Sequence, residues 1–202
     1  MTDNEKKNFC TTAASAVGYM EKISCDYKSY ESKTANTGRG NYTRFGRIAD
    51  AMLSGRDRRI KDGFSWCAMF LLACLYESKA GHVDTTKNAG AMALNAETVD
   101  WCKEQLNVEK SYGWQYYAGV DVWVKAFKKA GMVSNTPHYG DIVVFLNRGI
   151  AYHIGLVVSV NADSVTTIEG NTSSIGNEVV SNGGCVAMKR RKVNANTIFL
   201  QL

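Results

Sequence analysis

The residue pattern of this chain changes at Gly131, and that change restricts the folds open to it. Before Gly131, apolar residues recur at helical spacing in the segments 11–23, 45–53, 66–78, 98–106 and 120–130. After it, short β-rich runs are bounded by turn residues, at 141–146, 153–160, 165–169, 185–190 and 197–200. Helices followed by strands predict an α+β domain, in which N-terminal helices pack on one C-terminal antiparallel sheet of about five strands.

Segment 66–78 is almost entirely apolar and carries a cysteine near its start. We expect Cys67 to begin a helix that is buried on most sides, with Ser65 as its N-cap. The free amides and positive dipole end of such a helix favour the nucleophilic thiolate, and the Cys67 N–H would be available to stabilise an oxyanion. Taken alone, a cysteine in this setting more often has a structural role, as we expect for Cys74 two turns further along.

His153 is the histidine best placed to activate that thiol. His82 follows a glycine in a loop and His138 follows the only proline, so we expect both to be exposed. His153 instead opens an apolar strand, which places an imidazole at the rim of the sheet, where it can face Cys67 as a base. The alternative is a strand-end histidine bonded to a backbone carbonyl.

Glu169 and Asn171 are candidates for the group that orients His153. They are two residues apart, so on a strand they point to the same face. If the loop between the two strands has an odd number of residues, Glu169 falls opposite Gly155 and Asn171 opposite His153, all on one face. An even loop without a bulge would send Glu169 to the far face. The sequence therefore predicts an odd loop or a bulge.

Several stretches resemble the CHAP amidase/peptidase family, a papain-like branch of cell-wall hydrolases related to the NlpC/P60 group. They are the segments that contain the cysteine, the histidine and the glutamate together with one further strand, at 66–70, 140–145, 153–157 and 167–172. Segments 17–22 and 41–46 are similar to the N-terminal segments of CHAP proteins in phage and prophage lysis modules. The resemblance covers residues 12–190.

This resemblance implies a papain-like fold and hydrolysis of an amide bond in peptidoglycan. It gives Cys67 the role of nucleophile, His153 that of general base and acid, Glu169 that of orienting carboxylate, and Asn171 that of a second polar support. We further predict that substrate is bound by Trp66, Asn41, Tyr42 and Tyr152.

Two departures from the family pattern stand out. The family strand usually begins Pro-Gly-Asp, whereas here two residues separate the proline from the glycine, in segment 137–141. Some members bind calcium through an Asp-rich loop before the cysteine, but the matching stretch 55–63 has two aspartates among four cations. Because calcium requires several clustered oxygens, we predict neither a metal nor another cofactor.

Charge and hydropathy limit the partners of the chain. The net charge of +5 suits a polyanionic bacterial wall and is too small to indicate nucleic acid; the basic run 189–192 is most simply a solvated strand end. No apolar run is long enough for membrane insertion, and no secretory signal is visible. We expect a monomeric single domain over residues 1–202 without a separate wall-binding domain. It would be made in the cytoplasm with its cysteines unpaired, and would act on peptidoglycan after release.

Three biological roles remain open. The leading one is a phage or prophage endolysin that acts as an N-acetylmuramoyl-L-alanine amidase or as a stem or cross-bridge endopeptidase. The second is a secreted antibacterial amidase toxin neutralised by an immunity protein. The third is a phage structural or wall-binding component with little turnover, against which an intact set of catalytic residues argues.

Overall fold

The computed structural model describes residues 1–53, 62–87, 92–110, 113–174, 179 and 182–202. The helices are α1 (Asp3–Ser15), α2 (Arg44–Leu53), α3 (Cys67–Ala80), α4 (Ala96–Gln105) and α5 (Val120–Ala130), with short 3₁₀ turns η1 (Tyr27–Ser29), η3 (Val108–Lys110) and η4 (Trp114–Tyr116). The strands are β1 (Val133–Ser134), β2 (Ile142–Asn147), β3 (Ile150–Val160), β4 (Ser164–Thr172), β5 (Cys185–Lys192) and β6 (Thr197–Leu200). The predicted α+β class is confirmed, since helices precede strands throughout the described residues.

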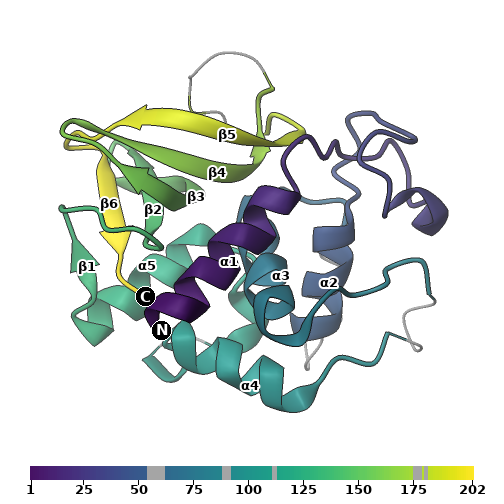
Figure 1. Ribbon diagram of the computed structural model, residues 1–202, viewed down its shortest axis with the longest axis horizontal. Coiled ribbons are helices and arrows are strands. Elements are labelled where there is room, and N and C mark those ends of the chain that lie inside the picture. The colour runs from purple at the N-terminus through teal and green to yellow at the C-terminus, as the bar shows by residue number, and fades with distance from the viewer. Residues whose placement is uncertain (54–61, 88–91, 111–112, 175–178, 180–181) are drawn as a thin grey trace.

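The sheet is antiparallel, with the strand order β1-β6-β2-β3-β4-β5. Figure 1 shows the helices gathered on one side of it. Helix α3 is central, because it contacts α1, α2 and α4 as well as β3 and β4, and it is buried from Cys67 to Glu77. No helix in the described part of the chain is long and apolar enough to cross a bilayer.

The helix expected at 11–23 is wrong in its bounds, because α1 runs from Asp3 to Ser15. A capping box fixes its start: the Thr2 hydroxyl accepts from the Glu5 amide, and the Glu5 carboxylate accepts from the Thr2 amide. After α1 the chain turns at Gly18, whose φ is 88°, and then runs alongside the start of β5. Segment 17–23 therefore makes isolated β-bridges, and it is not helical.

Other element predictions hold with small corrections. The helices expected at 45–53 and 120–130 are confirmed as α2 and α5, and Gly131 ends α5 with a φ of 70°. Ser65 is not the N-cap of α3; Trp66 occupies that position and its side chain makes no capping hydrogen bond. The sheet gains a sixth strand, β1, which pairs with β6 over two residues and is too short to show a sequence period.

The β3–β4 hairpin has the bulge that the register argument requires. Val160 pairs with Val165, which is the even alternative, but the pairing shifts between Val157 and Ser159. Beyond the shift Leu156 pairs with Ile168, so the register becomes the one that an odd loop would produce. A Cβ added to Gly155 would lie 2.7 Å from the Cγ atom of Glu169. Glu169 therefore lies across from Gly155, as predicted.

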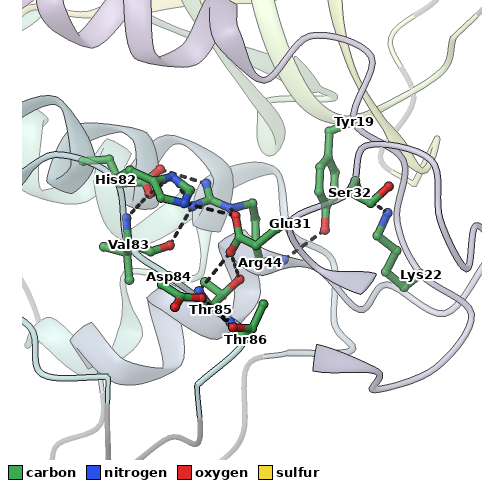
Figure 2. Close-up of polar contacts among 11 residues, drawn as sticks. Tyr19, Lys22, Glu31, Ser32, Arg44, His82, Val83, Asp84, Thr85 and Thr86 are labelled. Carbon is green, nitrogen blue, oxygen red and sulfur yellow. Dashed lines mark hydrogen bonds and ion pairs between the residues drawn. The ribbon is translucent and has the colours of Figure 1, made fainter. Parts of the chain in front are cut away.

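A polar cluster connects the first residue of α2 to the C-terminal end of α3. The Arg44 guanidinium donates to both oxygens of Glu77, at 2.9 and 2.7 Å, and its Nε lies 3.3 Å from Glu31. Figure 2 shows His82 beside the same groups, with its Nε2 3.2 Å from Glu31. At 1.5 Å per residue, Glu77 is about 15 Å along α3 from Cys67, so this cluster is remote from the start of the helix.

Candidate active site

Cys67 is the first residue of α3, as the sequence predicts. Its side chain is buried, with 4% of the residue exposed, and the Phe70 amide donates to the Trp66 carbonyl at 2.8 Å to close the first turn. The amides of a first turn have no partner within their own helix and give it a positive electrostatic potential. The thiol thus lies at a helix end where backbone amides can stabilise a developing oxyanion.

His153 lies inside β3, which begins at Ile150, so the expectation that it opens the strand at the rim of the sheet is wrong. Its Nε2 is 3.0 Å from Oε2 of Glu169, and both side chains are fully buried. Nδ1 is buried without a partner of ordinary hydrogen-bond geometry among the described residues. Cys67 is nevertheless near enough to affect the titration of the imidazole ring. Because Nε2 is bonded to Glu169, Nδ1 is the nitrogen left to face the thiol. We call Cys67, His153 and Glu169 the relay.

Contacts within the site favour the ionised forms of both His153 and Glu169. Burial alone would lower the pKa of His153, but hydrogen bonding and charge from Cys67 and Glu169 raise it to about 9. Burial would raise the pKa of Glu169, but Arg191 and His153 lower it to about 2. The arrangement therefore supports an imidazolium beside Cys67, held by a carboxylate that is ionised at neutral pH.

Arg191 is a member of this site that sequence reasoning missed. We expected the run 189–192 to be a solvated strand end, and this is wrong for Lys189 and Arg191, of which 4% and 3% are exposed. Its Nε and one terminal nitrogen donate to the two oxygens of Glu169, at 2.7 and 2.5 Å. The available signal was the period of two in β5, which buries Lys189 and Arg191 and exposes Arg190.

Asn171 contacts the turn before the nucleophile. Its φ of 56° lies in the left-handed region and breaks the alternation of β4, so the argument that placed it on the face of Glu169 does not apply. Its Nδ2 donates to Oγ of Ser65 at 3.2 Å, and its Oδ1 accepts from the Gly184 amide at 3.2 Å. Its role as a second polar support stays a prediction, now directed at the segment that precedes Cys67.

Trp66 is fully buried, so the structure does not support the predicted contact between its side chain and substrate. Its ring stacks on Phe45 with centroids 5.8 Å apart, and its Nε1 donates to Oε2 of Glu21 at 3.0 Å. Glu21 is itself buried, and its amide donates to the Gly184 carbonyl. Trp66 and Glu21 therefore hold the backbone that presents Cys67, and sequence reasoning missed Glu21 entirely.

The other predicted substrate-binding residues are partly exposed. Asn41 has a φ of 58°, and its carbonyl accepts from the Gly63 amide at 3.2 Å, so segment 41–42 lies beside the approach to α3. The Tyr42 ring lies against Gly63. Tyr152 precedes His153 in β3 and lines a pocket of about 410 Å³ together with Arg191. Contact of these three side chains with substrate stays a prediction.

The residues compared above with calcium loops lie mostly outside the described chain, at 55–61. Asp62 is described, and its carboxylate accepts from the Tyr30 hydroxyl at 2.5 Å and from the Thr43 amide at 2.9 Å. Burial raises the pKa of Asp62 to about 6. Among the described residues no three His, Cys, Asp or Glu side chains are grouped as metal ligands. The absence of a metal stays a prediction.

Acid pH is expected to destabilise the fold through Glu169. Because its folded pKa of about 2 is below the ordinary value of 4.5, its contribution is fully present above pH 4.5 and is lost as pH falls through 2. A shift of this size corresponds to about 3 kcal/mol in the free energy of unfolding. Urea denaturation between pH 5 and 2 should show a steeper loss in the wild type than in Glu169→Gln. The exposed-residue control Glu97→Gln should follow the wild type. Parallel curves for all three proteins would contradict the contribution of the ionised Glu169 carboxylate to stability.

Comparison with known proteins identifies the family of the domain that contains this site. A family model described as the CHAP domain matches residues 59–171, more than half of the chain, and the match includes Cys67, His153, Glu169 and Asn171. No curated protein and no solved structure matches the chain. Domains of this family are generally hydrolases that act on peptidoglycan, and a helical layer on an antiparallel sheet is consistent with their papain-like fold. The chain therefore belongs to the CHAP domain family.

Proposed function

We propose that this protein is a cysteine-dependent peptidoglycan hydrolase that cleaves an amide bond through an acyl-enzyme. The observation that carries the proposal is the placement of His153, with one ring nitrogen 3.0 Å from a buried carboxylate and the other left for Cys67 at a helix start. A thiol, an imidazole and an orienting carboxylate in this order are the groups that nucleophilic amide hydrolysis needs.

In the first half of the reaction the Cys67 thiolate attacks the amide carbonyl carbon. A carbon–sulfur bond forms and the carbonyl electrons move to oxygen, where backbone amides of the first turn of α3 stabilise the oxyanion. When this intermediate collapses, the carbon–nitrogen bond breaks and Nδ1 of His153 gives its proton to the leaving amine. The products are a free amine and a thioester on Cys67.

In the second half water hydrolyses the thioester. Neutral His153 takes a proton from water through Nδ1 while the oxygen attacks the thioester carbonyl. The carbon–sulfur bond then breaks, which releases a carboxylic acid and restores the thiolate beside an imidazolium. Throughout, Nε2–H donates to Glu169, which fixes the tautomer and stabilises the ring when it is charged.

We assign the reaction to the bacterial wall after release of the enzyme from the cytoplasm, as in phage lysis. The net charge of +5 supports attraction to an anionic wall. Either the lactyl-alanine amide or a peptide bond of the stem or cross-bridge fits the chemistry, since both present an amide carbonyl to the thiolate.

Digestion of purified sacculi tests this function. We expect new free amino groups to appear without new reducing sugar ends, because an amide bond and not a glycosidic bond is cut. Mass spectrometry of the released fragments then identifies the bond: intact stem peptides freed from muramic acid indicate an amidase, and shortened peptides an endopeptidase. Reducing ends without new amino groups would refute the proposal.

Chelation should leave the activity intact. The stretch 55–63 has two aspartates among four cations, and this charge composition would repel a divalent cation. We expect EDTA at millimolar concentration to change the rate of sacculus digestion by less than about twofold. Loss of activity in EDTA with recovery on addition of calcium would contradict the prediction that the enzyme needs no metal.

A further inference from the structure

The Glu169 carboxylate receives more hydrogen bonds than a histidine partner requires. Besides His153, Arg191 donates to both of its oxygens, Thr167 donates to Oε1 at 2.6 Å and Thr172 to Oε2 at 3.2 Å. Glu169 is completely buried and Arg191 is nearly so. A forked arginine contact fixes the plane of a carboxylate, which a single-point contact does not do.

We propose that Arg191 is a positioning residue of the relay, which fixes the Glu169 carboxylate so that its Oε2 holds the His153 ring toward Cys67. This proposal rests on the proposed function and adds a residue to it. Arg191 lies in β5, beyond residues 59–171 that the family model matches, so the match assigns it no role.

A second contact connects Arg191 to the imidazole. Its guanidinium lies over the Phe145 ring, 5.4 Å from the centroid, and the same ring stacks on His153 with centroids 5.8 Å apart. Arg191 therefore supports His153 by two routes, a polar one through Glu169 and an apolar one through Phe145. A change at Arg191 should alter the orientation and the protonation of the ring together.

The charge of Arg191 also favours the ionised state of Glu169. Burial alone would raise the pKa of this carboxyl, and Arg191 is the largest influence that lowers it. Without the guanidinium, Glu169 would take up a proton at mildly acidic pH, and a neutral carboxyl stabilises an imidazolium poorly. The activity should then fail at a higher pH than in the wild type.

Arg191→Gln tests this role, with Arg190→Gln as a matched control. Arg190 is the neighbouring cation, exposed, with its Nε bonded to Ser164 at 3.2 Å. On solubilised peptidoglycan fragments we expect Arg191→Gln to lower kcat at least about tenfold with little change in KM. We also expect the acid limb of its pH profile to move up by about one unit or more. Arg190→Gln should keep the acid limb of the wild type, because Arg190 lies on the exposed face of β5, opposite the face that carries Arg191 to Glu169.

Carboxyl titration by ¹³C NMR of glutamate-labelled protein gives a readout that does not depend on activity. In the wild type the chemical shift of the Glu169 carboxyl should show an ionised group down to about pH 3. In Arg191→Gln the same carboxyl should titrate near or above the ordinary pH range of glutamate. Unchanged titration and pH profile in Arg191→Gln would overturn the proposal. If the wild type does not hydrolyse peptidoglycan but the Glu169 titration shifts as expected in Arg191→Gln, the proposed function fails and the contact between Arg191 and Glu169 stands.

Arg191→Lys covers the case in which the glutamine variant does not fold. Lysine keeps the charge but offers one point of contact in place of the fork. We expect it to keep the titration of Glu169 low while kcat still falls by several fold. Wild-type kcat in Arg191→Lys would show that the fork does not position the carboxylate and would overturn the positioning role.

Discussion

Replacement of Cys67 by alanine is expected to abolish peptidoglycan hydrolysis while the protein stays folded. The substitution removes the sulfur that forms the acyl-enzyme, and loss of a nucleophile typically costs about four to six orders of magnitude in kcat. Alanine is a good helix former and differs from cysteine by one atom, so α3 should still begin at this position. Turbidity loss of sacculus suspensions measures the activity, and circular dichroism measures the fold.

Cys74→Ala is the matched control for this experiment. It removes the same atom from the same helix two turns further along, where Cys74 is equally buried. We expect its activity to remain within about twofold of the wild type, provided that the protein folds. Cys67→Ser should resemble Cys67→Ala, because a hydroxyl is a poorer nucleophile. Retained lysis in Cys67→Ala, together with loss of lysis in a folded Cys10→Ala, would show that the nucleophile is misassigned.

Features that depend on short sequence patterns could be predicted from the sequence. Helix α5 was predicted residue for residue, since its apolar period is regular and Gly131 marks its end. The pairing of Glu169 with Gly155 was accessible too, because the period of two in a hairpin allows few registers. Parity alone did not decide between an odd loop and a bulge, and the structure contains the bulge.

Contacts between residues that are distant in the sequence could not be predicted. Glu21 and Trp66 are 45 residues apart, and Arg191 and Glu169 belong to different strands, so no local period links them. Both pairs bury a charged side chain, which sequence rules assign to the surface by default. Trp66 was misread for a related reason: its place beside the nucleophile suggested substrate contact, whereas its ring belongs to the core.

Loss of His153 is expected to be nearly as severe as loss of Cys67, and loss of the Glu169 charge less so. His153→Ala removes both the base that stabilises the thiolate and the acid that protonates the leaving amine, so we expect kcat to fall at least about 10³-fold. Glu169→Gln keeps a group that can orient the ring but stabilises its cation poorly, so its kcat should lie between those of the wild type and His153→Ala. Equal losses in the two variants would contradict this order.

Glu169→Gln should also lower the stability of the fold, and a second substitution separates the two functions of Glu169. In Glu169→Gln the buried Arg191 guanidinium loses its counter-charge, and breaking one partner of a buried ion pair costs about 3–5 kcal/mol. Removing both charges in Glu169→Gln/Arg191→Met should recover much of that stability, because the buried guanidinium that lacked a counter-charge is gone. The double variant should stay as slow as Glu169→Gln, since packing is restored and the carboxylate is not. Recovery of kcat together with stability would mean that Glu169 acts on catalysis only through the fold, and the relay would then consist of Cys67 and His153 alone.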